Sequence, residues 1–251
     1  MAVATAATAQ AGRPCEDTPM TAQAVERGLA LAERTRAALE ASGAQVVLLA
    51  RAGQDLSAYG LRWSHLGFAY RDGDAADAPW RVLHKLNHCG TAEAAVYRQG
   101  LGQFFLDSPA RYEAAFVPLA PELAARLRPL LQDNAAASRL HEPRYSMLAY
   151  PWATRYQQSN QWAIETLVMA ADAAGSRRQA QGWLQARGYQ PTVLRLGPLT
   201  RLGARATRAN LAFDDHPSDQ RFADRIATVT VDSVFAWLPR AGLAGAVVEL
   251  R

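Results

Sequence analysis

The 251-residue chain lacks the features that mark membrane, fibrous and repeat proteins. No stretch approaches the roughly 18 apolar residues that a transmembrane helix requires, so we expect no transmembrane segment. Charged residues make up only 20% of the chain and hydrophobic residues 49%, a balance that excludes a disordered protein. No internal repeat is present, which argues against solenoid and propeller folds. The composition therefore predicts a globular protein with a sizeable core.

Lysine is nearly absent, because Lys85 is the only lysine among the 27 basic residues. The formal net charge is +4, and the arginines are spread along the chain with a single doublet at Arg177 and Arg178. A nucleic-acid-binding protein should gather its basic residues or interleave them with aromatic ones. The sequence therefore predicts no nucleic-acid partner.

Cysteine is also scarce, since the chain has only Cys15 and Cys89. Residues 1–11 are small and alanine-rich, and they end in the small-x-small pattern that precedes a signal-peptidase site. We expect residues 1–11 to be the remnant of an export signal or a disordered leader. Residues 12–251 would then form a single domain in the periplasm or another exported location. Export favours a disulfide between the two cysteines, and a reactive thiol at Cys89 is the alternative.

The spacing of apolar residues predicts an α+β fold. Helical periodicity covers 21–42, with Thr21 as a candidate N-cap. Short apolar or alternating runs predict strands at 45–51, 64–70 and 80–87, and the last two should form an antiparallel hairpin. A short helix should follow and end at residue 97. Further helices are expected at 121–131, at 176–187, at 200–207 and beginning at residue 159. A strand is expected at 113–119, extended segments at 145–150 and 191–196, and a helix or strand at 230–238. The fold is therefore a central antiparallel sheet packed by helices.

Polar residues suited to chemistry occur at three places. His65 lies on the strand at 64–70, two residues before Gly67, which would allow another segment to approach closely. His84 lies on the neighbouring strand, and a shared sheet face is open to both histidines. Ser159 and Asn160 open a helix. A nucleophile at a helix N-terminus is favoured in its anionic form by the macrodipole, and a histidine on an adjacent strand can take its proton.

This order of motifs resembles the circularly permuted papain-like hydrolases, the group of permuted NlpC/P60 and lecithin-retinol-acyltransferase-like proteins. In that group a strand with a His-x-Gly motif precedes a polar residue on the next strand, and a nucleophilic cysteine follows at the start of a buried helix. The resemblance implies a permuted papain-like architecture and an amidase or acyl hydrolase, with a cell-wall peptide or an acyl group as ligand. It also implies that His65 is the general base and that His84 orients it.

The sequence departs from that group because no cysteine lies near residue 160. The apolar face of the helix places Asn160 in the nucleophile position, and a shift of one residue places Ser159 there. Serine can attack if His65 reaches it, whereas asparagine cannot. Two hypotheses stay open: a hydrolase or acyltransferase with serine in place of cysteine, and an inactive fold that binds an envelope peptide or lipid. In the second, Asn160 and Gln161 would donate hydrogen bonds, and Trp162 would form an apolar wall.

Each candidate residue also has a structural explanation. Ser159 would be a good N-cap, and His65 and His84 can be satisfied polar residues of a hairpin. A third hypothesis is therefore an envelope structural or interaction protein without chemistry in a cleft. A metal site at His84, His88 and Cys89 is disfavoured, because the spacing of these residues at a strand end does not aim them at one ion. We expect neither a metal nor a cofactor.

A closer resemblance covers most of the chain, from about residue 12 to residue 238. It is to an uncharacterised bacterial family of exported proteins, classed as domain-of-unknown-function family 2145. The segments that carry it are 63–68, 86–91, 104–107, 159–162 and 212–217. In the last segment we expect a turn in which the side chains of Asp214 and Asp215 cap backbone amides. This resemblance implies no particular substrate.

Overall fold

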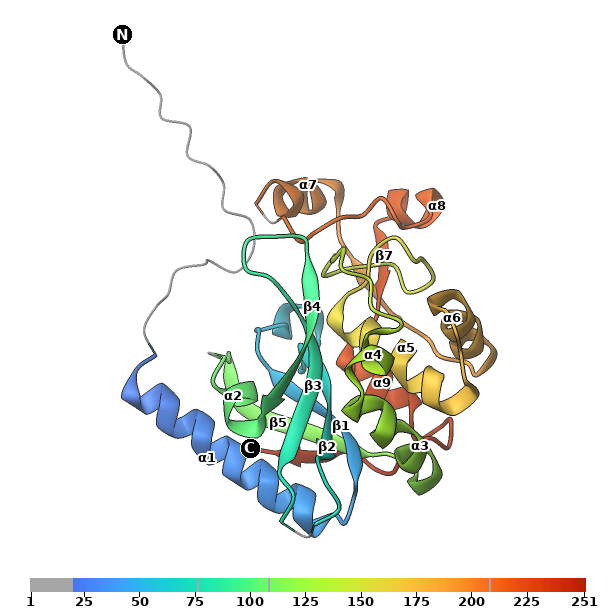
Figure 1. Cartoon of the computed structure of the whole chain (residues 1–251). Coiled ribbons are helices and arrows are strands. Elements are labelled where there is room, and N and C mark those ends of the chain that lie inside the picture. Colours follow the sequence, from blue (N-terminus) through green and yellow to red (C-terminus); the bar gives the residue numbers. More distant parts are fainter. Residues whose placement is uncertain (1–19, 76, 108, 208) are drawn as a thin grey trace.

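The computed structural model describes residues 20–75, 77–107, 109–207 and 209–251. Its centre is a six-stranded sheet with the strand order β4-β3-β2-β1-β5-β8, in which every neighbouring pair is antiparallel (Figure 1). The strands are β1 (Val46–Ala52), β2 (His65–Arg71), β3 (Trp80–Asn87), β4 (Ala94–Gly100), β5 (Arg111–Pro118) and β8 (Val248–Leu250). The predicted α+β class and the predicted hairpin of β2 and β3 are confirmed.

Helices cover both faces of the sheet, which explains why β1 is buried at all seven positions. On one face, Val47 and Leu49 pack with α1 (Ala22–Ala41) and α2 (Leu101–Phe105). On the other face, Leu48 and Ala50 pack in a second, larger cluster with helices from the later part of the chain. A strand covered on both sides reads as a continuous apolar run rather than an alternating one.

The first helix follows the sequence pattern closely. Thr21 is its N-cap, and the Thr21 hydroxyl accepts a hydrogen bond of 3.1 Å from the backbone N–H of Ala24. Gly43 follows the helix with a φ of 67°, a left-handed conformation that glycine adopts without strain. The predicted helix and its cap are therefore confirmed.

The larger core cluster lies between the sheet and a layer of helices around α5 (Ser159–Asp172). Every residue from Ser159 to Ala170 is buried, so α5 is a central helix rather than a surface helix. The helix predicted at 176–187 is α6, with Ser176 as its N-cap. The other helices of this layer are α3 (Pro121–Gln132), α4 (Asn134–Ser138), α6 (Arg177–Ala186) and α9 (Val231–Trp237).

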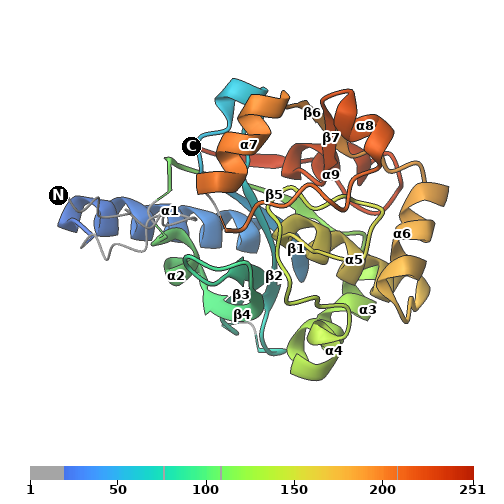
Figure 2. The same cartoon turned by 90° about the horizontal axis from the view of Figure 1, so that it is seen from above.

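A small lobe lies at one end of the molecule, as Figures 1 and 2 both show. It contains an antiparallel pair of strands, β6 (Thr192–Arg195) and β7 (Arg225–Thr228), and two helices, α7 (Pro198–Thr207) and α8 (Ser218–Phe222). We call these four elements the β6–β7 lobe. A short 3-10 helix, η1 (Ser57–Tyr59), connects β1 to β2.

The helix predicted to end at residue 97 is wrong. That segment is strand β4, which pairs with β3 over seven residues, so the tertiary pairing overrides the helix-forming alanine and glutamate residues. The segment 145–150 contains no strand, and the final predicted element is helix α9. None of the described helices combines the length and the apolarity that crossing a bilayer demands. Residues 1–11, and Cys15 with them, lie outside the described residues.

Candidate functional site

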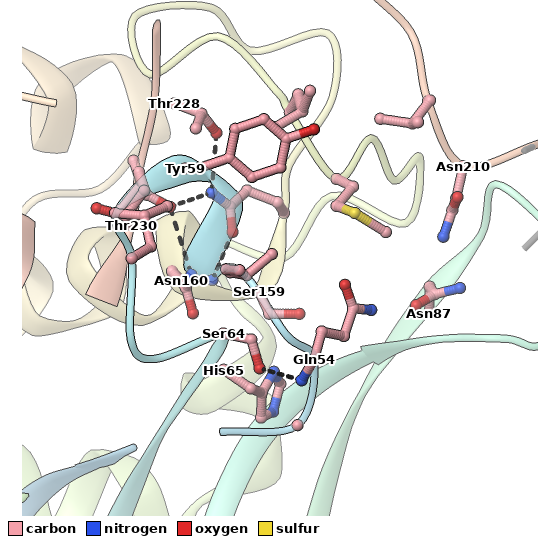
Figure 3. Close-up of a pocket in the computed structure, with 18 of the residues that line it drawn as sticks. Gln54, Tyr59, Ser64, His65, Asn87, Ser159, Asn160, Asn210, Thr228 and Thr230 are labelled. Atoms are coloured by element: carbon pink, nitrogen blue, oxygen red, sulfur yellow. Dashed lines mark hydrogen bonds between the residues drawn. The ribbon is translucent and has the colours of Figure 1, made fainter. Parts of the chain in front are cut away.

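A cavity of about 610 Å³ lies where the end of the sheet, the first turn of α5 and the β6–β7 lobe meet (Figure 3). One part of its lining is polar and includes Arg51 and His65 from the sheet, Ser64 directly before β2, and Ser159 and Asn160 from α5. Another part is apolar and is formed by Leu61, Leu148, Leu194, Leu196, Leu211 and Phe213. The cavity therefore suits a ligand with a polar group and an apolar group.

The hairpin brings His65 and His84 into direct contact. Nε2 of His65 lies 2.8 Å from Nδ1 of His84, and Nε2 of His84 lies 3.0 Å from Oε1 of Gln99 on β4. A Cβ atom on Gly67 would lie only 2.9 Å from the Cβ atom of His84. The segment that was expected to pass close to Gly67 is therefore the neighbouring strand at His84.

This hydrogen-bonded chain fixes the tautomers of both rings. The amide oxygen of Gln99 can only accept, so Nε2 of His84 carries the hydrogen and Nδ1 of His84 accepts from Nε2–H of His65. Nδ1 of neutral His65 is then the basic nitrogen. Burial, and secondly the positive charge of Arg51, lower the pKa of His84 to about 3. His84 is therefore neutral near pH 7 and orients His65 without competing for its proton.

Arg51 and Phe104 form a rigid frame around the two histidines. The buried Arg51 guanidinium donates to the backbone oxygen of Phe104 and to the carboxylate of Asp107. Its central carbon lies 4.6 Å from the centroid of the Phe104 ring, and that centroid lies 5.2 Å from the centroid of His84. Sequence reasoning missed Arg51 and Gln99 as parts of the site, because each reads as an ordinary polar residue near a strand end.

The first turn of α5 is capped by Gln158 and not by Ser159. Oε1 of Gln158 accepts a hydrogen bond of 3.0 Å from the backbone N–H of Asn160. The Gln158 amide also donates to Oγ1 of Thr228, at 3.1 Å, and to the backbone oxygen of Val229. The expected N-cap role of Ser159 is therefore wrong, and Ser159 is instead the first residue of the helix.

Ser159 lines the cavity beside the buried Tyr145. Burial raises the pKa of the Tyr145 phenol, and hydrogen bonds from the Ser159 hydroxyl and backbone N–H partly oppose that shift. Within the described residues Ser159 makes no hydrogen bond with His65, although both line the same cavity. Transfer of a proton from Ser159 to His65 would therefore require the serine hydroxyl to turn away from Tyr145.

The three residues after Ser159 lie in different surroundings. Asn160 lines the cavity, where its amide nitrogen donates to the backbone oxygen of Val229 and its Oδ1 has no donor among the described residues. Gln161 instead donates to the backbone oxygen of Pro151. Trp162 is fully buried in the core. The structure therefore does not place Gln161 or Trp162 in the cavity wall, where they were expected.

A second buried amide lies across the cavity from Asn160. Asn210 is almost fully buried, lines the cavity, and has an Oδ1 atom without a donor among the described residues. Figure 3 shows Asn210 near Asn87 on the side opposite Asn160. Sequence reasoning missed Asn210, because an isolated asparagine in a loop carries no local signal.

The remaining candidate segments are the residues considered as metal ligands, the turn at 214–217 and Cys89. No group of three or more His, Cys, Asp or Glu side chains suited to a metal occurs within the described ranges. The segment at 214–217 is a turn, as predicted, and the Asp215 carboxylate accepts from the backbone N–H of Tyr150 at 2.7 Å and contacts the His216 ring at 2.9 Å. Asp214, which was also expected to cap a backbone amide, instead pairs with Arg155 at 2.9 Å. Cys89 lines the cavity and is not a free thiol. Its pairing with Cys15 stays a prediction, because Cys15 lies outside the described residues.

Comparison with known proteins gives one family. No curated protein and no solved structure matches the chain. The family model described as "Uncharacterized protein conserved in bacteria" (DUF2145) matches residues 38–238, a range that contains every cavity residue named above. The chain therefore belongs to the DUF2145 family.

Proposed function

We propose that this chain is an acyl hydrolase or acyltransferase that uses Ser159 as its nucleophile and His65 as its general base. The observation that carries the proposal is the hydrogen-bonded chain from Gln99 through His84 to His65, which ends in the same cavity as the start of α5. A base oriented by a neutral second group, in the same cavity as a hydroxyl at a helix N-terminus, supplies the groups that acyl transfer uses.

In the proposed reaction, Nδ1 of His65 takes the proton from the Ser159 hydroxyl as Oγ attacks the carbonyl carbon of an ester or amide. The bond from carbon to the leaving group then breaks, and His65 returns the proton to that group, which leaves an acyl-serine. Water, or an acceptor alcohol or amine, then gives a proton to His65 as it attacks the acyl-serine. Oγ of Ser159 leaves and takes that proton back from His65, which releases the acyl group. The raised pKa of Tyr145 keeps its phenol protonated, so Tyr145 can donate to the developing oxyanion.

The order of these elements along the chain supports the resemblance to permuted papain-like hydrolases. The base lies on β2, the orienting histidine on the neighbouring β3, and the helix start comes later at α5. We therefore propose a permuted papain-like architecture, with serine in the position that cysteine holds in that group. The small, alanine-rich N-terminal residues support an exported location as part of the same proposal.

A fluorophosphonate probe tests the nucleophile, and p-nitrophenyl esters test turnover. We expect intact-protein mass spectrometry and peptide mapping to find the adduct on Ser159. The His65→Ala variant should lose about 100-fold to 10,000-fold in kcat/KM, the range for a general base. Ser159→Ala should show neither labelling nor turnover, and Ser159→Cys should keep activity.

Ser176→Ala is the matched control, because Ser176 also lies at a helix start and does not line the cavity. This variant should lose about 1 kcal/mol of stability with its cap and keep full activity. Equal turnover by wild type, Ser159→Ala and His65→Ala, or no labelling of Ser159, would reject the hydrolase.

The alternative is a binding protein, and the buried amides favour it. Oδ1 of Asn160 and Oδ1 of Asn210 are two acceptors without donors among the described residues, and both residues line the cavity. Both oxygens are buried in the cavity wall, so a ligand with N–H or O–H groups would satisfy them once the two amide side chains turn toward it. In that case Asn160→Ala should weaken the binding of a fluorescent acyl-peptide probe at least tenfold, whereas Ser159→Ala should leave the affinity unchanged.

A further inference from the structure

Helix α7 presents its apolar side chains to the solvent. Leu199 and Leu202 are three residues apart and share one face, and they are 85% and 67% exposed. Thr200, Arg201 and Ala204 lie toward the opposite face and line the cavity. A surface helix ordinarily directs its leucines to the core. Because the leucines of α7 face the solvent instead of the core, this face of the helix is suited to contact with another molecule or surface.

The same end of the molecule exposes further apolar side chains. Phe222 at the end of α8 is 76% exposed, and Val193 on β6 is also exposed. The side chain of Arg201 joins α7 to the turn after α8, because it donates to the backbone oxygen of Leu196 and to the Asp224 carboxylate. Figures 1 and 2 both show α7 and α8 at this one end. The three most exposed large apolar side chains of the described residues, Leu199, Phe222 and Leu202, therefore all lie on this lobe.

The charge around these side chains is positive. Arg195, Arg205 and Arg225 are exposed on the lobe, and Arg221 lies over the Phe222 ring at 5.2 Å. None of these four arginines forms an ion pair with a described residue. Three of the acidic residues of the lobe and of the turn before it are paired, Asp214 with Arg155, Asp215 with His216 and Asp224 with Arg201, so Asp219 on α8 is the one exposed carboxylate beside these four arginines within the described part of the lobe.

We propose that the exposed face of the β6–β7 lobe docks the protein on an anionic lipid surface. Leucine and phenylalanine side chains would enter the boundary between headgroups and acyl chains, and the arginines would contact lipid phosphates. Charge complementarity favours this occupant over an apolar protein surface, because lipid phosphates would attract the exposed arginines and an apolar surface would not. The inference does not rest on the proposed function, since neither His65 nor Ser159 belongs to this face.

Sedimentation with lipid vesicles tests the docking surface. We expect the full chain to pellet with vesicles of phosphatidylglycerol and phosphatidylcholine, to bind vesicles of phosphatidylcholine alone at least tenfold more weakly, and to dissociate as salt is raised. The double variant Leu199→Ser with Leu202→Ser should lose binding at least tenfold. Its fold should stay intact because both side chains are exposed, and a thermal melt checks this point.

Leu29→Ser is the matched control, because Leu29 is an exposed leucine on α1, outside the β6–β7 lobe. It should bind vesicles as the wild type does. Arg195→Gln with Arg225→Gln should weaken binding to the anionic vesicles only. Wild type that stays in the supernatant, or a double leucine variant that binds normally, would overturn the proposal. A dimer in light scattering that the leucine variant dissociates would also overturn it, in favour of a second copy of this chain.

Discussion

Replacement of Glu165 by alanine should destabilise the protein strongly, because this carboxylate lies at the centre of a buried polar network. Glu165 is fully buried on α5 and accepts from Arg177 at 2.7 Å, from Gln157 at 2.5 Å and from Gln181 at 2.7 Å. Gln157 in turn accepts from Lys85 at 2.9 Å. Burial lowers the pKa of Lys85 to about 7, which limits the excess positive charge in the network.

The size of the expected loss in unfolding free energy follows from the positive charge of Arg177, which Glu165→Ala leaves without a partner. Arg177 also donates to the backbone oxygens of Thr154 and Tyr156, so it cannot leave without releasing the segment that leads to α5. Removal of one partner of a buried ion pair costs about 3–5 kcal/mol, because the other charge stays buried and uncompensated. We expect Glu165→Ala to lose that amount of unfolding free energy in urea titrations.

Two comparisons separate the charge effect from simple loss of volume. The double variant Glu165→Leu with Arg177→Met should recover part of the loss, because it removes both charges but also the bonds from Arg177 to the backbone oxygens of Thr154 and Tyr156. Glu33→Ala, which breaks an exposed ion pair with Arg36 on α1, should leave the free energy of unfolding nearly unchanged. A loss below about 1 kcal/mol in Glu165→Ala would show that the network carries little of the stability.

Three further predictions concern the hairpin and the cysteines. Gly67→Ala should lose about 1–3 kcal/mol by urea titration, because the new Cβ would meet the Cβ atom of His84 at 2.9 Å, whereas Gly100→Ala, with open space at that position, should not strain the fold. Because the pKa of His84 is about 3 in the folded protein and about 6.5 in the unfolded chain, the unfolded chain binds a proton at His84 at a higher pH than the folded protein does. The free energy of unfolding should therefore fall by a few kcal/mol as the pH is lowered from about 6.5 to 3. A free energy of unfolding that stays constant over this range would contradict the low pKa of His84. Thiol titration of the unreduced, unfolded protein should find neither Cys15 nor Cys89 free, and their bridge should contribute on the order of 4 kcal/mol; two free thiols would exclude it.

The contact between His65 and His84 could be predicted from the sequence. The two neighbouring strand patterns predicted the hairpin, and Gly67 indicated that another segment lies close to β2. Gln99, the hydrogen-bond partner on the far side of His84, could not be predicted, because it belongs to β4, whose alanines favour a helix. Pairing with β3 decides the state of that segment, and pairing between strands is not a local property.

The cap of α5 shows a second limit. Ser159 has the local signature of an N-cap, yet Gln158 performs that role with its longer side chain. The Gln158 amide is held by Thr228 and Val229, some seventy residues later in the chain. A cap that depends on such distant partners is set by the tertiary fold, so local preference selects the wrong residue.

The turn that leads into α5 concentrates polar groups where a stable core would ordinarily exclude them. Residues 157–161 are five consecutive polar residues, and all are buried. Buried polar groups cost free energy unless they are hydrogen-bonded. Gln157 is satisfied by the Glu165 network and Gln158 by its role as the cap, so structure accounts for both. Ser159 and Asn160 line the cavity, and Oδ1 of Asn160 has no donor among the described residues. Oε1 of Gln161 also has no donor among the described residues although Gln161 does not line the cavity, so it is the position of Asn160 in the cavity wall, and not the missing donor alone, that supports a ligand as its partner.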